Sequence, residues 1–392
     1  TVKGFSSSNV LALDVTDPNN PLRMRTLPDK NEGGDYTITL LTESGHEYFI
    51  TENITSNVAN DITVDVPSQL RSTDNHADYL IITTLNLMNS AKRLADHRAS
   101  QGLSSMIVDI EDIQDEFSGS LPAPEATHDF LAYVYENWAV VPRYVSFIGD
   151  GSYDYKDHLG YGYPQVPSML VPTKDAYYPS DNAIADVAGG DGVPEFAVGR
   201  IPVVDSDELD RYIDKLIAYE HAIHDKSSVM ALVTDKSDPL AGDFQASADK
   251  VAGNVPDNFV VHRFDVDTLG KKGTHDKIVD TLRQGASIMH YIGHSSLIGY
   301  GRTLLTAKEL ETMSNIGPSM LMVSMSCSAA SFGYPPMNSI GETAVLREDG
   351  AAVAFFGASG VSYNYLADIM AEGFYRSLFD SANLKIADAV VQ

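Results

Sequence analysis

The chain has 392 residues, 43% of them hydrophobic, so it can bury a large core and suits two or three domains or subdomains. Its 54 acidic residues outnumber its 27 basic residues, and the net charge of -27 argues against binding to nucleic acid or to an anionic membrane while favouring cationic partners. No uninterrupted apolar run reaches the roughly 18 residues that a membrane-spanning helix needs, so we expect no membrane span.

The first segment of the chain reads as a small antiparallel β module, which we place at residues 1–76. Short alternating runs at Tyr36–Leu40 and Glu47–Thr51 are typical of half-buried strands. Turn-forming stretches rich in Pro, Asn, Gly and Asp precede them, at 17–21 and 31–35. No helical periodicity is evident in this segment.

From residue 78 the pattern alternates between apolar runs and helical periodicity. A helix that continues to about Gln101 follows the first run, and Pro124 opens another. This βαβ rhythm predicts a mostly parallel sheet with helices on both faces. The expected strands are Tyr79–Ile82, Ser105–Ile110 and Tyr144–Ile148.

The next stretch, residues 152–195, is long and rich in Tyr, Pro, Gly and Asp, which is typical of a functional loop. Its carboxylates are hard oxygen ligands that suit structural calcium, although their spacing matches no EF-hand loop. The alternative is a solvated acidic loop. The metal candidates are Asp150, Asp154, Asp181 and Asp191.

After a helix at 207–220, a second βα series follows. Its predicted strands lie at 229–234, 259–264, 286–292, 320–325 and 351–356. Its predicted helices lie near 243–252, 274–283, 339–347 and 366–379.

Three strands of this second series end in reactive residues: Asp235, His294 and Cys327. Reactive groups of open α/β sheets collect at the carboxyl ends of strands, so we expect these three to lie together. Cys327 is the only cysteine and is therefore either an inert core residue or a nucleophile. A thiol, an imidazole and a carboxylate are the parts of a cysteine peptidase, and the backbone N–H groups of Ser295 and Cys327 suit an oxyanion site.

Two of these assignments have rivals. His290 lies inside the predicted strand, where a packing role is expected, whereas His294 occupies the Gly-His turn after it. Asp235 either orients the imidazole or only forms a turn in the run 234–239.

Four segments carry a family resemblance, and together they resemble the gingipain family of cysteine peptidases in the caspase-like clan. They are 147–154 (FIGDGSYD), 197–203 (AVGRIPV), 291–294 (YIGH) and 324–327 (SMSC), within a similarity that spans 78–392. The resemblance implies two caspase-like α/β subdomains, at 77–226 and 227–392. It also implies Cys327 as the nucleophile, His294 as general acid and base, and Asp235 as the third, acidic member. The gingipains have Gly after the catalytic His, where this chain has Ser295.

Asp243 resembles the acidic residue with which some gingipains accept a basic side chain. A carboxylate there would pair with both ends of a guanidinium, but Asp243 also suits the N-cap of the helix that follows. Tyr363 and Tyr365 could form an aromatic wall for the bound side chain, or only core.

The resemblance implies a secreted or cell-surface bacterial cysteine endopeptidase that cleaves after a basic residue, Arg more than Lys. Its partners would be peptides and proteins carrying that residue. No cofactor is expected beyond structural calcium, and the oligomeric state is open. Two alternatives remain: a sortase-like transpeptidase of the same family, and a catalytically silent member that acts as a binding or assembly module. The low cysteine content and the acidity also suit an exported protein, and the start at Thr1 suits a processed product or part of a longer precursor.

Overall fold

The computed structural model describes residues 1–18, 20–52, 66–161, 165–222, 228–380 and 385–391. The chain divides into two compact units, 1–67 and 68–392, and each is described by itself.

The first unit is built from two small antiparallel sheets, with strand orders β1-β5-β4 and β3-β2-β6. Alternating residues of these short strands bury a small cluster around the fully buried Ile38, which also contains Val10 and Leu40. The strands are β1 (Val2–Phe5), β2 (Leu11–Asp14), β3 (Leu22–Arg23), β4 (Leu27–Lys30), β5 (Tyr36–Thr39) and β6 (Tyr48–Thr51).

The second unit begins with a four-stranded parallel sheet of order β12-β9-β7-β8. Its central strand is buried on both faces, as expected where helices cover a parallel sheet from both sides. The strands are β7 (Tyr79–Thr83), β8 (Ser105–Asp109), β9 (Tyr144–Ile148) and β12 (Ala197–Ile201).

Helices cover both faces of this first sheet. Leu80 and Ile82 pack on one face with helices α2, α3 and α4, while Tyr79 and Ile81 pack on the other with α1 and α5. The helices are α1 (Met88–Ser100), α2 (Ile110–Ser118), α3 (Pro124–Asn137), α4 (Asp181–Ala185) and α5 (Ser206–Ala222).

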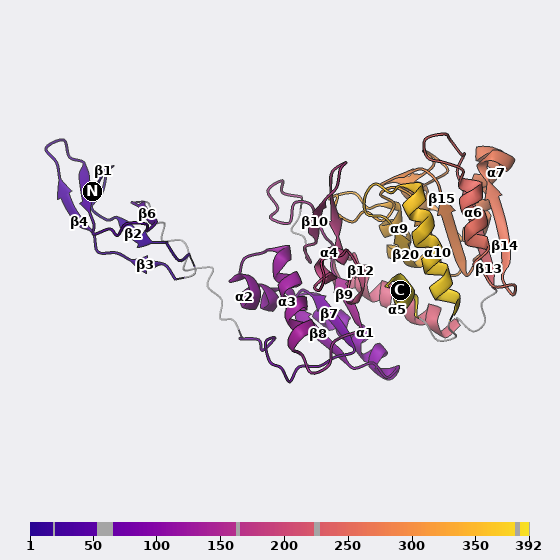
Figure 1. Cartoon of the computed structure of the whole chain (residues 1–392), viewed down its shortest axis with the longest axis horizontal. Helices are drawn as coiled ribbons and strands as arrows, with labels where there is room; N and C mark the ends of the chain where they lie inside the picture. The colour runs from indigo at the N-terminus through magenta and orange to yellow at the C-terminus, as the bar shows by residue number, and fades with distance from the viewer. Residues whose placement is uncertain (19, 53–65, 162–164, 223–227, 381–384, 392) are drawn as a thin grey trace. The chain divides into compact units, whose positions relative to one another are not determined.

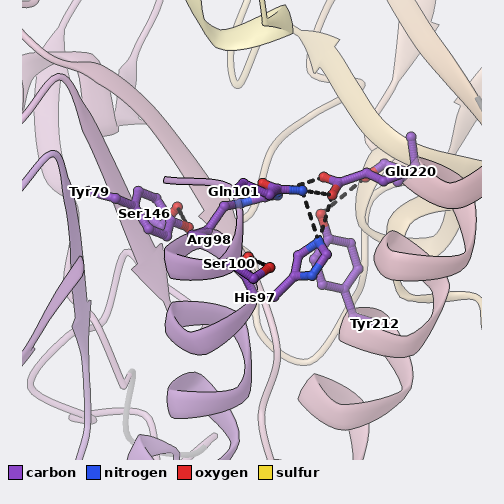
Figure 2. Close-up of polar contacts among 9 residues, drawn as sticks. Tyr79, His97, Arg98, Ser100, Gln101, Ser146, Tyr212 and Glu220 are labelled. Carbon is purple, nitrogen blue, oxygen red and sulfur yellow. Dashed lines mark hydrogen bonds and ion pairs between the residues drawn. The ribbon is translucent and has the colours of Figure 1, made fainter. Parts of the chain in front are cut away.

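A polar cluster ties α1 to α5 beside this core (Figure 2). The carboxylate of Glu220 contacts His97 Nε2 at 2.7 Å and accepts hydrogen bonds from Arg98 at 2.7 Å and Gln101 at 2.8 Å. Partial burial raises the pKa of Glu220, but the contacts with His97 and Arg98 outweigh it, so the pKa lies below its usual value. These side chains pair with one another, so we interpret the cluster as a structural link between the two helices.

A second parallel sheet of order β14-β13-β15-β19-β20 follows, and β13, β14, β15 and β20 are labelled in Figure 1. Strands β15 and β19 lie at its centre and are buried along their whole length. The strands are β13 (Val229–Thr234), β14 (Val260–Asp265), β15 (Ile288–Ile292), β19 (Met320–Met325) and β20 (Ala352–Gly357).

Helices also cover both faces of the second sheet. Met230 and Leu232 pack on one face with α6, α10 and α11, while Ala231 and Val233 pack on the other with α7, α8 and α9. The helices are α6 (Phe244–Ala252), α7 (Val266–Gln284), α8 (Ala307–Thr312), α9 (Ile340–Leu346), α10 (Asn364–Asp380) and α11 (Ile386–Val390).

Helix α5 is shared by the two sheets. Its Tyr212 packs against the core clusters of both, and the Tyr212 hydroxyl donates to the Val353 carbonyl at 3.1 Å. The buried Lys215 donates to the carbonyls of Val345 and Arg347 at the end of α9. This burial lowers the pKa of Lys215 to about 7.

Two small antiparallel elements lie outside the main sheets. One is a hairpin, β10-β11, and the other is a three-stranded sheet, β16-β17-β18. They are β10 (Met169–Pro172), β11 (Tyr177–Ser180), β16 (Ser295–Ser296), β17 (Gly299–Tyr300) and β18 (Leu305–Thr306).

Parallel sheets flanked by helices, with small antiparallel sheets before them, confirm the predicted fold class. Among the described helices, none combines the length and the apolar character needed to cross a bilayer.

Candidate active site

The carboxyl ends of β15 and β19 bring His294 and Cys327 to the same edge of the second sheet. The two strands are parallel neighbours, and Ile292 pairs with Met325. His294 and Cys327 each follow two residues after this pair. They therefore occupy matching positions on adjacent strand ends, as the sequence predicts.

The Cys327 thiol is half-buried in a turn that the backbone holds firmly. Its Sγ lies 3.5 Å from both the N–H and the carbonyl of Ser362, in the loop after β20. Ser328, the next residue, has a φ of 52°, and its N–H donates to the Gly360 carbonyl at 2.8 Å. A non-glycine residue with this backbone is strained, and such strain is common at functional sites.

Ser295 links the turn after β15 to the turn after β19, because its hydroxyl donates to the Cys327 carbonyl. Ser295 lies in strand β16, an extended conformation that serine adopts without strain, so glycine is not required here. The hydrogen bond from the Gly301 N–H to the His294 carbonyl makes Ser295 and Tyr300 a non-hydrogen-bonded pair. The N–H of Ser295 therefore points away from β17, as an oxyanion donor must.

Glycine is needed two residues before Ser295. Gly293 has a φ of 155°, and a Cβ there would lie 2.3 Å from the Cβ of Asp235. Only glycine lets β13 and β15 approach this closely just before His294.

The carboxylate that contacts His294 is Asp238, which sequence reasoning missed. Oδ2 of Asp238 lies 2.5 Å from Nε2 of His294, whose side chain is 54% exposed. This hydrogen bond, with further bonds from the Leu240 and Ala241 N–H groups, lowers the pKa of Asp238 to about 2. The ring of Phe244 meets the imidazole edge to face, with centroids 5.6 Å apart. An Asp-Pro turn directly after β13 was the available signal.

Asp235, the acid expected from the sequence, lies beside other groups. Its Oδ1 accepts a hydrogen bond from the Lys236 N–H at 2.8 Å, and both carboxylate oxygens lie close to Gly301. Its neighbour Tyr291 donates to the His294 carbonyl at 2.6 Å. Burial, reinforced by Asp235, raises the pKa of Tyr291 well above its usual value. The contacts of Asp235 therefore favour support of the His294 backbone over orientation of its ring.

His290 is fully buried inside β15, where Nδ1 lies 2.7 Å from the Tyr375 hydroxyl. Burial lowers the pKa of His290 to about 3, so this imidazole is neutral at physiological pH. The position matches the packing role expected of it.

Asp243 occupies the N-cap of α6, the alternative role that the sequence left open. Its exposed carboxylate accepts hydrogen bonds from the N–H groups of Gln245 at 3.0 Å and Ala246 at 3.1 Å. Tyr365 is 66% exposed at the start of α10, with its ring centroid 6.3 Å from that of Tyr363. The tyrosine pair therefore faces solvent on the chain segment that contacts Cys327.

The four candidate calcium ligands have separate partners. Asp181 pairs with Arg200 through both oxygens, at 2.8 and 2.7 Å. Asp154 and Asp191 accept backbone hydrogen bonds within their own turns, and Asp150 accepts from the Gly151 N–H at 2.7 Å. Within the described part of the chain, no three acidic, His or Cys side chains form a group that could hold a metal.

Asp150 instead shares a cavity of about 370 Å³ with Glu342 of α9, alongside Phe332 and Tyr334. Burial, more than the nearby negative charges, raises the pKa of Asp150 to about 6 and that of Glu342 to about 8. These two carboxyl groups lie at the junction of the two sheets.

The model of Peptidase family C25 matches residues 72–392. Gingipain R2 of Porphyromonas gingivalis is 21% identical over 302 residues, which cover 76% of this chain and 38% of the relative. Gingipain R1 of the same organism is 21% identical over 254 residues, which cover 63% of this chain and 23% of the relative. The chain thus spans well under half the length of these curated relatives.

Among solved structures, the chain is similar to the Arg-specific cysteine proteinase gingipain R. The TM-score is 0.64 at 18% identity, over 80% of this chain and 69% of that one. This likeness shows a shared fold.

Proposed function

The chain belongs to peptidase family C25. From this premise we propose that it is a cysteine endopeptidase that hydrolyses peptide bonds after a basic residue, Arg more than Lys. The observation that supports the proposal best is the placement of Cys327 and His294 on adjacent strand ends, tied together by Ser295. The acidity of the chain and the Arg specificity named for gingipain R support the preference for a basic residue.

In the proposed reaction, His294 takes the proton of the Cys327 thiol. Because Nε2 of His294 contacts Asp238, the proton passes to Nδ1, and the carboxylate steadies the charged ring. The thiolate attacks the scissile carbonyl carbon, a C–S bond forms, and the carbonyl electrons move to oxygen. The N–H groups of Ser295 and Cys327 would stabilise that oxyanion.

Collapse of the oxyanion breaks the C–N bond, and His294 gives its proton to the leaving amine. Water then attacks the thioester and His294 accepts a proton from it. Breakage of the C–S bond releases the carboxyl product, and His294 returns the proton to the Cys327 sulfur. Hydrolysis leaves a free carboxyl group on the product, whereas transpeptidation would leave a new amide bond. We propose a secreted or cell-surface location, in line with the exported character of the composition.

A peptidyl-arginine reagent with a thiol-reactive end group tests the proposal. We expect mass spectrometry of the folded, reduced protein to locate one adduct on Cys327, and none in Cys327→Ala or after denaturation. No adduct in the folded protein would refute the peptidase proposal. Incubation with a mixed peptide library should yield free carboxyl termini after Arg. Cleavage that does not depend on Arg or Lys before the scissile bond would refute the proposed specificity.

A further inference from the structure

A cation lies over a tyrosine ring next to the residue that contacts Cys327. Lys174, in the turn of the β10-β11 hairpin, places its Nζ 4.1 Å from the centroid of the Tyr363 ring. The Tyr363 hydroxyl donates to the carboxylate of Asp175, the next hairpin residue. The ring of Tyr365 lies at 34° to that of Tyr363, with 6.3 Å between centroids. The Lys174 ammonium thus lies over the Tyr363 ring, which in turn contacts the Asp175 carboxylate and the Tyr365 ring.

This cluster adjoins the candidate active site through the chain itself. Tyr363 directly follows Ser362, whose backbone contacts the Cys327 sulfur at 3.5 Å. The hairpin is anchored to the same loop, because the Ser359 hydroxyl donates to the Pro179 carbonyl at 2.7 Å. At Gly360, a Cβ would lie only 2.3 Å from the Tyr178 ring, so strand β11 packs directly on this loop.

The chemistry of the cluster is that of a cation site. Aromatic faces attract ammonium and guanidinium groups, and a neighbouring carboxylate adds charge pairing. The carboxylate of Asp175 has further lone pairs besides the one that accepts from Tyr363. The hydrogen bond with Tyr363, followed by the charges of the cluster, raises the pKa of Lys174. The Lys174 side chain is exposed, so this internal cation can leave without disturbing the core.

We propose that Asp175, Tyr363 and Tyr365 form a subsite for a basic side chain of the peptide substrate, and that Lys174 occupies this subsite until substrate displaces it. The proposal rests on the function proposed above and adds a recognition group from the first sheet's half of the unit. Arginine should displace Lys174 better than lysine does. Its planar guanidinium can stack on a tyrosine ring while pairing with a carboxylate, whereas a lysine ammonium offers only a point charge.

Binding of N-acetyl-arginine amide to the Cys327→Ala variant, followed by NMR titration, tests the subsite without any chemical step. Adding Lys174→Met should tighten binding roughly 3- to 10-fold, because displacing an exposed cation–aromatic contact opposes binding by about that factor. Asp175→Asn and Tyr365→Ala should each weaken binding by about 3-fold or more. The neutral isostere N-acetyl-citrulline amide should bind weakly and respond to none of these changes.

Lys30→Met is the matched control, because Lys30 also lies over a tyrosine ring, at 5.5 Å from Tyr36, but in the first unit. Unchanged affinity in Lys174→Met would overturn the role of Lys174. An equal gain for citrulline would show that the site does not recognise charge. If Cys327 fails to react with the peptidyl reagent while the arginine analogue still responds to Lys174→Met, the proposed peptidase activity fails and the cation site stands.

Discussion

The two parallel sheets of the second unit use their carboxyl ends in opposite ways. At the first sheet, Arg200 and Asp181 form an ion pair with side chains only 5% and 11% exposed. Arg200 also donates to the Gly149 and Val166 carbonyls, both at 2.9 Å. At the second sheet, the paired groups His294 and Asp238 are 54% and 37% exposed. One edge buries its ion pair, and the other leaves the paired groups exposed to solvent.

The same contrast occurs along one strand and the turn after it. His290 lies inside β15, buried beside Tyr375, whereas His294 lies two residues after the end of β15 and is 54% exposed. Position relative to the end of the strand, not residue type, separates the buried histidine from the candidate catalytic one.

Replacing each of these histidines tests the contrast most strongly. His294→Ala should lower kcat/KM about 1,000-fold, because a general acid–base group commonly contributes two to four orders of magnitude. His290→Phe should keep kcat per folded molecule near its original value and lower the free energy of unfolding by about 1–3 kcal/mol, since the Tyr375 hydroxyl loses its partner. Steady-state kinetics with urea unfolding separate the two outcomes. Equal losses of kcat in the two variants would contradict the separate roles given to His290 and His294.

The buried ion pair of the first sheet should act on stability alone. Arg200→Met leaves the buried Asp181 carboxylate unpaired, which typically costs about 3–5 kcal/mol of unfolding free energy. We expect urea midpoints to fall sharply while folded molecules still react with a neutral alkylating reagent at Cys327. Loss of that reaction in protein shown to be folded would mean that the first edge also serves chemistry.

The two aspartates after β13 can be separated in the same way. Asp238→Asn should reduce kcat about 10- to 100-fold, less than loss of a buried triad acid, because solvent can partly support the exposed imidazole. Asp235→Asn should affect kcat less, since its carboxylate lies beside Gly301 and the Lys236 N–H. A larger loss of kcat in Asp235→Asn than in Asp238→Asn would instead indicate that Asp235 orients the imidazole.

The buried carboxyl group of Glu342, in the cavity that it shares with Asp150, should make stability depend on pH. Burial raises the pKa of Glu342 from 4.5 to about 8, so the folded state holds a proton that the unfolded state has lost between these values. Stability from this group is therefore complete below pH 4.5 and falls as pH rises towards 8, by up to about 1.4 kcal/mol for each pH unit.

Glu342→Gln should flatten this slope in urea unfolding at pH 5, 6.5 and 8. The glutamine amide oxygen can still accept from the Ser339 N–H, so the helix cap is kept. Asp150, whose pKa is about 6, should leave a smaller slope below pH 6. An unchanged slope above pH 6.5 would exclude Glu342 as its source.

Sequence periodicity was enough to predict the sheets, because their strands are continuous apolar runs followed by turns. It also predicted that His294 and Cys327 would share an edge, since parallel register carries equivalent positions to the same end. The match to peptidase family C25 confirms the gingipain-like resemblance.

Contacts between segments far apart in the sequence could not be predicted in this way. Asp238 and Asp235 are both acids in one turn, and only the 2.5 Å contact between Asp238 Oδ2 and His294 Nε2 shows which of them faces the imidazole. The stretch 152–195 looked like loop because its short elements, β10, β11 and α4, are rich in Tyr, Pro and Asp. Its contact with Tyr363 depends on tertiary packing, for which local sequence holds no signal.

Helix α5 has a consequence for how the molecule comes apart. Tyr212 and Lys215 supply donors to carbonyls of the second sheet's half while their helix packs on the first sheet. Separating the two sheets would expose the face of α5 that packs against the core of the other sheet. We therefore expect residues 68–392 to melt in one calorimetric transition, and gene fragments that encode either sheet alone to yield insoluble protein. The two halves have similar architecture, but we expect them to fold and unfold as one cooperative unit.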